Sequence, residues 1–156
     1  MHAMTPDECL RFLWTGNRTM VVATLRADGR PHLTPVWYTV DGSRVVFLPP
    51  GNSAKVRHIR RDPRITLFVD EEAPPFAYVA LEGIAEVVEA PEEVRHWVER
   101  IGARYLGEER ARPYRERYLS AGDILVWVSP NKMSGYDFVD DDDGFLATPR
   151  ADDTRS

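Results

Sequence analysis

Short extended segments separated by tight turns occupy the first third of this chain. Residues 19–26 are apolar on both faces of an extended backbone, which is typical of a strand inside a sheet. Asp-Gly pairs at 28–29 and 41–42 are hairpin turn signals, and they separate this segment from two further strand-like runs at 32–40 and 44–48. Strands joined by such short turns pair antiparallel, so the three runs predict an antiparallel meander.

Strand signals continue along the chain, with helical patterns between them. We expect strands at residues 65–69, 76–88, 124–128 and 133–138. We expect helices that start near residues 5, 53 and 91, where capping or proline signals occur, and a short helix near 114–119. Six or seven mostly antiparallel strands with peripheral helices indicate a mainly β fold that forms a small barrel, because closure removes exposed sheet edges.

Two residues predict local irregularities in these strands. Pro35 lacks a backbone N–H, so it indicates a sheet edge, a bulge or a place where the backbone stays open. Gly83 lies midway along the 76–88 run and indicates a bulge or a bend. Both positions therefore mark where the sheet is expected to depart from regular pairing.

Composition narrows the class of protein. A chain of 156 residues with 43% hydrophobic and 29% charged residues is typical of one globular domain, which we place at residues 1–138. Residues 139–156 are rich in aspartate, and we expect a disordered acidic tail. The net charge of −5 argues against nucleic-acid binding, and no apolar stretch approaches the ~20 residues needed to cross a membrane. Cys9 is the only cysteine and no export leader is visible, so we expect a cytoplasmic protein.

The segment 51–64 carries the strongest signal for function. Ser53 is a good helix N-cap, and the free N–H groups at a helix start attract anions. Lys55 places an ammonium in the same first turn, so the two residues are suited to the phosphate of a cofactor. The alternative is a solvated cationic helix face. Helical spacing puts the arginines between positions 57 and 61 in one sector, which predicts a surface stripe and leaves Lys55 with Ser53 as the more specific pair.

No arrangement of side chains typical of direct catalysis is visible. The motifs of serine hydrolases, zinc sites, dinucleotide-binding folds and P-loops are missing, so an enzyme of this sequence would rely on a bound cofactor. The alternating residues 32–36 either face a flat polar ring or form a half-exposed strand. Phe76 and Tyr78 share one face of a strand and are either core residues or part of a cofactor wall.

These segments, in this order, resemble the split-barrel superfamily of flavin and deazaflavin oxidoreductases, which includes the pyridoxamine phosphate oxidases. The resemblance spans residues 5–138 and is carried by V-A-T-L-R-A-D-G-R-P at 22–31, H-L-T-P-V-W at 32–37, S-A-K-V-R-H-I-R-R-D-P-R at 53–64 and L-E-G at 81–83. The third segment looks most like the actinobacterial branch that uses the deazaflavin coenzyme F-420. The resemblance implies a six-stranded antiparallel split β-barrel and a homodimer with two cofactor sites at the subunit interface.

Carried over by position, the resemblance implies a set of cofactor-binding residues. The phosphate would be held by Ser53, Ala54, Lys55 and Arg57. The ring would lie against His32, Thr34, Pro35 and Val36, flanked by Leu48, with Phe76 and Tyr78 reaching it from the other subunit. Many relatives carry a polar residue at the position of Pro35, so the choice between flavin mononucleotide (FMN) and F-420 stays open.

The implied function is hydride transfer between reduced F-420 and a small organic substrate. The alternatives are an FMN-dependent oxidase or reductase of the pyridoxamine phosphate oxidase type, and a non-catalytic protein that binds a flavin or haem. The protein's own share of the reaction would be to position the reactants and shield them from water. No residue stands out as a proton donor, and Tyr78 and His32 are candidates by residue type alone.

Overall fold

The computed structural model describes residues 1–119 and 124–138 of the chain. The strands are β1 (His2–Ala3), β2 (Met20–Leu25), β3 (Pro31–Val36), β4 (Tyr38–Asp41), β5 (Arg44–Phe47), β6 (Arg64–Glu71), β7 (Ala77–Val88) and β8 (Leu125–Asp137). The helices are α1 (Pro6–Trp14), α2 (Ala54–Arg61), α3 (Pro91–Leu106) and α4 (Glu108–Leu119). In these two ranges no helix is both long and apolar enough to cross a membrane. The expected acidic tail at 139–156 lies outside the described residues.

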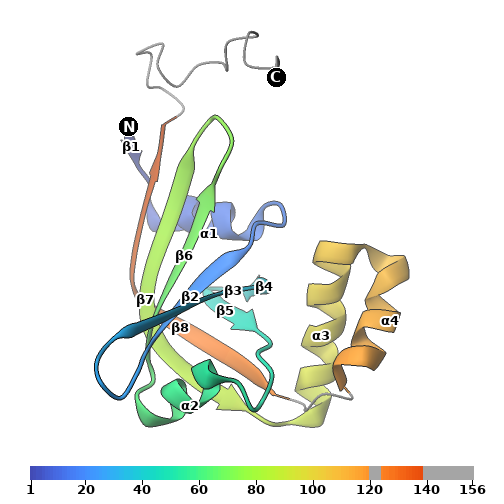
Figure 1. The fold of residues 1–156 in the computed structure, drawn as a ribbon. Helices are drawn as coiled ribbons and strands as arrows, with labels where there is room; N and C mark the ends of the chain where they lie inside the picture. The colour runs from blue at the N-terminus through green and yellow to red at the C-terminus, as the bar shows by residue number, and fades with distance from the viewer. Residues whose placement is uncertain (120–123, 139–156) are drawn as a thin grey trace, which may run out of the picture.

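One antiparallel sheet forms the body of the described structure. Its strand order is β3-β2-β6-β7-β8-β5-β4, and β1 pairs with the end of β8. The sheet curls into a half-barrel, and the α3–α4 pair stands beside one end of it (Figure 1). The expectation of a mainly β split barrel with peripheral helices is therefore confirmed.

The grouping of the strands differs from the expectation at one residue. The predicted run 32–40 breaks at Trp37 into β3 and β4, which lie at opposite ends of the strand order. Because consecutive Cα atoms are ~3.8 Å apart, the two sheet edges approach to within about 7 Å at Trp37. The β2–β3 and β4–β5 hairpins form as predicted, but the three-strand meander does not.

The number of strands changes with this grouping. The runs predicted at 124–128 and 133–138 join in the single strand β8, which pairs with β7 over its whole length. With the break at Trp37, the described sheet has seven strands along its path and the two-residue β1, where six strands were expected. The difference arises because a long partner strand keeps β8 continuous, whereas the passage between the two sheet edges interrupts the earlier run.

Both predicted irregularities are confirmed. The strand that contains Pro35, β3, is an edge strand. The register between β7 and β8 shifts at Gly83, where a Cβ atom would lie 2.5 Å from the carbonyl oxygen of Ser129. A side chain has no room at this position, and the bulge allows the two long strands to bend.

The core lies between the curled sheet and α1. This helix begins with the predicted capping box, in which the Thr5 hydroxyl accepts from the Glu8 N–H and the Glu8 carboxylate accepts from the Thr5 N–H. Leu13 of α1 is fully buried, and the buried Tyr38 donates its hydroxyl hydrogen to the Leu13 carbonyl at 2.8 Å. Burying each large apolar side chain contributes roughly 1.5–3 kcal/mol. These contacts hold α1 against the β4 edge of the sheet.

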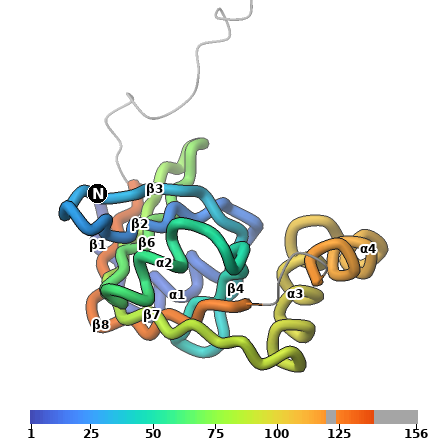
Figure 2. The backbone as a smooth tube through the Cα atoms, turned by 60° about the horizontal axis from the view of Figure 1, so that its bottom comes forward, coloured from blue at the N-terminus to red at the C-terminus, as the bar shows by residue number. Residues whose placement is uncertain are grey.

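The α3–α4 hairpin lies outside the sheet, beside β4 (Figure 2), and specific contacts fix it to the end of the barrel. Arg104 donates to the carbonyls of Leu13 and Gly16, and the Tyr105 hydroxyl donates to the Arg18 carbonyl at 2.7 Å. A second apolar cluster lies beneath the hairpin and consists of Val46, Val94, Trp97, Val98, Leu125 and Trp127. The hairpin is therefore positioned by both polar and apolar contacts.

The last helix is longer than the sequence indicates. A short helix was expected near 114–119, but α4 begins at Glu108. The reason is tertiary, because α4 packs along α3 with Ala111 buried and Tyr114 lying close over Gly102. This packing stabilises helical turns whose own composition is strongly charged.

Candidate functional site

The start of α2 has the predicted N-cap backbone but no capping side chain. Ser53 adopts an extended conformation (φ −70°, ψ 155°) just before the first helical residue, Ala54. The Ser53 hydroxyl does not cap the helix, and the Ser53 N–H donates to the Pro50 carbonyl at 2.9 Å. The first-turn N–H groups of α2 therefore lack the usual capping oxygen and are available to an external acceptor.

Three buried polar atoms lie on residues for which the sequence predicts cofactor contacts. In the part of the chain that the structure describes, the buried side-chain atoms without a hydrogen-bond partner are His32 Nδ1, Thr34 Oγ1 and Ser53 Oγ. His32 and Thr34 lie on the same face of β3, because strand residues two apart point the same way. Leaving such a group unpaired costs about 1–3 kcal/mol, so these atoms are suited to a polar partner such as a ligand or a bound water.

A cavity of about 190 Å³ lies between the start of α2, the β3–β4 corner and the α3–α4 hairpin, and we call it the α2 cavity. Four residues of the predicted site line it, namely Pro35, Val36, Leu48 and Lys55. The other lining residues are Trp37, Pro49, Pro50, Ile101 and Tyr114. Segments far apart in the sequence thus form one enclosure beside the helix start.

Lys55 supplies the only charged side chain in the lining of the α2 cavity. It is half-buried and makes no hydrogen bond or ion pair with any described residue. Burial lowers the pKa of the Lys55 ammonium, because the charge loses water without gaining a partner. An anionic group in the cavity would supply that partner.

The arginine stripe of α2 lies on the surface, as predicted. Arg60 pairs with Glu89 at 2.5 Å, and Arg61 donates to a main-chain carbonyl of β2. Arg57 folds back and donates to the Asn52 carbonyl at 2.8 Å, so its guanidinium lies over the loop that precedes α2. Of the three arginines, Arg57 therefore stays nearest to the helix start.

Phe76 and Tyr78 do not line the α2 cavity of their own chain. Figure 1 shows the β6–β7 hairpin, where β7 begins, at the opposite end of the sheet from α2. The Tyr78 ring centroid lies 5.6 Å from that of Phe68 and 5.8 Å from that of Tyr136, across β6, β7 and β8. Neither Phe76 nor Tyr78 is fully buried, so they are not core residues either. A role for them at this cavity would require a second chain.

His32 and His58 form a pair near the end of α2. Their ring centroids are 5.1 Å apart, with the ring planes nearly perpendicular. His58 Nδ1 shares a hydrogen bond of 2.9 Å with the buried Thr24 hydroxyl. Partial burial, together with His32 and the nearby arginines, lowers the pKa of His58, so this ring is neutral at neutral pH. His32 thus has an uncharged neighbour and a free Nδ1.

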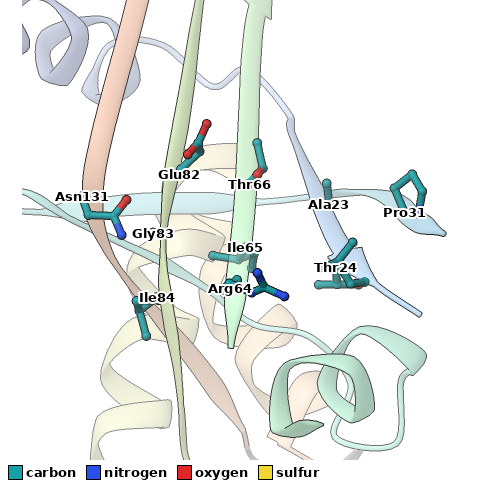
Figure 3. Close-up of a pocket in the computed structure, with 11 residues that line it drawn as sticks. Ala23, Thr24, Pro31, Arg64, Ile65, Thr66, Glu82, Gly83, Ile84 and Asn131 are labelled. Atoms are coloured by element: carbon teal, nitrogen blue, oxygen red, sulfur yellow. The ribbon is translucent and has the colours of Figure 1, made fainter. Parts of the chain in front are cut away.

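A larger hollow of about 360 Å³, which we call the outer hollow, lies on the sheet among β2, β6, β7 and β8 (Figure 3). None of the predicted site residues lines it, and its polar lining includes Arg64, Glu82 and Asn131. Arg64 pairs with Asp62 at 2.7 Å, and Glu82 pairs with Lys132 at 3.6 Å. The charges of the outer hollow are therefore already paired, which makes the α2 cavity the better candidate for an anionic ligand.

The sequence of the barrel matches one known family over most of its length. Residues 6–134, from α1 into β8, match the pyridoxamine 5'-phosphate oxidase family. The chain belongs to this family. The expected kinship with the split-barrel flavin and deazaflavin oxidoreductases is thereby confirmed.

Several solved structures share the fold of this family member. A conserved hypothetical protein of Mycobacterium tuberculosis, Rv2991, is 27% identical with a TM-score of 0.74, over 86% of this chain and 85% of that chain. An F420 reductase is 23% identical with a TM-score of 0.57, over 79% of this chain and 94% of that chain. A FAD-binding protein of Mesorhizobium loti is 20% identical with a TM-score of 0.62, over 88% and 97% of the two chains. The last two likenesses support the fold alone.

The sequence-based site lacks five residues that line the α2 cavity, namely Trp37, Pro49, Pro50, Ile101 and Tyr114. Trp37 directly follows the predicted ring-facing segment, and the two prolines directly follow Leu48, so these positions were the available signals. Ile101 and Tyr114 belong to the α3–α4 hairpin. No local pattern indicates that this hairpin folds against the β3–β4 corner, so these two residues could not be found from the sequence.

Proposed function

We propose that this chain is an oxidoreductase that transfers a hydride between reduced coenzyme F-420 and a small organic substrate. The observation that carries the proposal is a half-buried, unpaired Lys55 at a helix start where the Ser53 hydroxyl also lacks a partner. The chain belongs to the pyridoxamine 5'-phosphate oxidase family, and one fold neighbour is an F420 reductase. The A-K-V-R-H-I-R-R-D-P-R pattern at 54–64 resembles the F-420 branch and favours that cofactor.

The donors at the helix start fit the anionic group of such a cofactor. Lys55 offers a desolvated ammonium, Ser53 a buried hydroxyl, and the first turn of α2 from Ala54 onward its free N–H groups. Arg57 lies over the preceding loop and adds positive charge from the surface. Hydrogen bonds to a charged group are about twice as strong as neutral ones, so a phosphate would be a stronger partner for these donors than a neutral group.

The strand β3 offers polar atoms for the edge of a cofactor ring and apolar surface beside them. His32 and Thr34 have free buried polar atoms, while Pro35, Val36 and Leu48 line the adjoining cavity with apolar surface. When bound, the cofactor supplies the hydride. The share of these residues is to hold the ring and the substrate in a reactive orientation and to exclude water from the space between them.

We propose further that the active unit is a homodimer formed through the outer face of the sheet. Phe68 and Ile84 are 38% and 46% exposed, and Tyr78 with Tyr136 extends the row of rings that Phe68 begins. Exposed apolar surface of this kind marks interaction sites. A second copy packed there would supply Phe76 and Tyr78 to the cofactor. Sedimentation velocity checks this proposal, because we expect a dimer for the wild type and a weakened dimer for Ile84→Lys.

An FMN-dependent oxidase or reductase is the second candidate. Pro35 stands where many relatives carry a polar residue, so this position offers no N–H that would distinguish the ring of F-420 from that of a flavin. A fold neighbour is a FAD-binding protein. These two observations keep FMN as the alternative cofactor without changing the residues proposed to hold the phosphate.

Fluorescence titration of the purified protein with F-420, FMN and FAD tests the proposal. We expect saturable binding that is tightest for F-420, and oxidation of the reduced F-420 by members of a panel of small organic acceptors, followed by absorbance. Tighter binding of FMN, with turnover of reduced FMN, would favour the second candidate. Saturable binding without turnover over a broad panel would contradict an enzymatic role and indicate a protein that stores the cofactor.

A further inference from the structure

We propose that Tyr114, from the α3–α4 hairpin, donates a hydrogen bond to the same anionic group that Lys55 binds. Tyr114 is then a further cofactor-binding residue, contributed by a part of the chain outside the predicted motif. The inference rests on the proposed function, because it requires the phosphate of F-420 or of FMN to enter the α2 cavity. Tyr114 and Lys55 both line that cavity, one from α4 and the other from α2.

An anion in the α2 cavity needs more donors than Lys55 alone. The side chains with only apolar atoms in its lining are Pro35, Val36, Leu48, Pro49, Pro50 and Ile101. The lining residues whose side chains carry a donor are Lys55, Trp37 and Tyr114. A phosphate oxygen that leaves water and finds no donor loses the free energy of a hydrogen bond to a charged group. A free hydroxyl on the wall of the cavity would prevent that loss.

The Tyr114 hydroxyl is free, unlike those of the other tyrosines in the hairpin. Tyr105 donates to the Arg18 carbonyl at 2.7 Å, and Tyr118 donates to the Pro49 carbonyl at 3.0 Å. Tyr114 makes no hydrogen bond with any residue that the structure describes. Burial raises the pKa of the Tyr114 phenol, so the group keeps its proton and remains a donor at neutral pH.

Packing alone orients the Tyr114 ring. A Cβ atom at Gly102 would lie 2.8 Å from Tyr114 Cδ1, so the glycine is what allows the ring to approach α3. The Trp37 ring centroid lies 5.6 Å from that of Tyr114, and Trp37 is itself stacked on Tyr105 at 4.8 Å with ring planes 3° apart. Because apolar contacts hold the ring, the hydroxyl can bind a ligand without first breaking an internal hydrogen bond.

Tyr114→Phe tests the inference, because it removes the hydroxyl and keeps the ring. We expect the affinity for FMN to fall by at least about tenfold, the lower end of the range for a hydrogen bond to a charged group. The affinity for riboflavin, which lacks the phosphate, should stay the same. If the wild type binds F-420 and not FMN, the matched ligands are F-420 and its ribityl deazaflavin without the phosphate. Phosphorus NMR of the bound cofactor gives a second readout, and we expect its resonance to shift in the variant.

Tyr118→Phe is the matched control on the same helix. Its hydroxyl bonds to the main chain, so the substitution should lower thermal stability and leave the ratio of FMN affinity to riboflavin affinity unchanged. An unchanged ratio in Tyr114→Phe, whether both affinities fall or neither does, would overturn the inference and leave the proposed function intact. A wild-type protein that binds none of F-420, FMN and FAD would overturn the proposed function and this inference with it.

Discussion

The α2 cavity and the outer hollow differ in whether the charged side chains that line them are paired. The outer hollow is the larger, at about 360 Å³ against about 190 Å³, and its Arg64 and Glu82 are paired with Asp62 and Lys132. Lys55 in the α2 cavity has no partner among the described residues. The volume of a cavity therefore does not identify a binding site in this fold. A buried charge without a partner is the better guide, because its own free energy favours an incoming ion.

The pKa values of Asp62 and Lys55 are both lowered, but with opposite effects on the charged forms of the two groups. Hydrogen bonds from Arg64 lower the pKa of Asp62 to about 2, so the charged form of this acid is stabilised. Burial lowers the pKa of Lys55, so the charged form of this base is destabilised. The two shifts therefore separate a region whose charges are satisfied from one that is suited to a ligand.

The largest contrast between the two regions is expected in cofactor affinity. Lys55→Met removes the ammonium and keeps most of the side-chain volume, so binding of the phosphate-bearing cofactor should weaken by about 1.5–3 kcal/mol, or roughly 10–150-fold. Lys132→Met makes the same change on the outer face of the sheet, away from the α2 cavity, and should alter the affinity far less than Lys55→Met provided that sedimentation velocity shows an unchanged dimer. Fluorescence titration measures both variants. Equal affinities for Lys55→Met and the wild type would show that the anionic group binds elsewhere.

Substitutions at Gly102 and Gly83 test the packing of the two regions. Gly102→Ala would push against the Tyr114 ring, and Gly83→Ala would push against the Ser129 carbonyl. Each should lower the free energy of unfolding by about 1–3 kcal/mol, measured by urea denaturation. Only Gly102→Ala should also weaken cofactor binding, because it displaces a wall of the α2 cavity. A similar loss of affinity in Gly83→Ala would mean that the two regions are coupled.

A smaller effect concerns the stability of the cofactor-free protein. Lys55→Met should raise the melting temperature by up to about 2–4 °C, because it removes a half-buried charge that has no partner. The pKa of Lys55 is lower in the folded state than its ordinary 10.5, so the unfolded state binds more protons between the two values and wild-type stability rises with pH there. The advantage of the variant should therefore shrink as pH rises toward 10.5. Calorimetry at stepped pH measures this, and equal melting temperatures at neutral pH would indicate a well-solvated ammonium.

The smallest effect is expected at the ion pair beside the outer hollow. The stability that Asp62 contributes is fully present above its ordinary pKa of 3.8 and is lost as pH falls through about 2. Asp62→Asn should therefore destabilise the protein slightly at neutral pH and not at all below about pH 2, since surface ion pairs contribute little. Thermal melts at the two pH values provide the check. A loss as large as that of Gly83→Ala would contradict the assignment of this pair to the surface.

Much of the predicted site depends on signals between near neighbours in the chain. The start of α2 follows from a strand, a turn and the N-cap residue Ser53, which lie within about ten residues of one another. The alternation of residues 32–36 likewise places His32 and Thr34 on one face of β3 without knowledge of the rest of the fold. The same local logic predicted that the sheet departs from regular pairing at Pro35 and at Gly83, which the structure places on an edge strand and at a register shift.

The sequence by itself determined the mainly β barrel class, the helix start that carries Ser53 and Lys55, and the polar row on β3, because turns, caps and alternation act over a few residues. Only the tertiary structure decided that the chain passes from one sheet edge to the other at Trp37 and that the α3–α4 hairpin brings Tyr114 to the same cavity. The physical reason is that these contacts join segments tens of residues apart, whose meeting depends on how the whole sheet curls and not on the residues beside them in the chain.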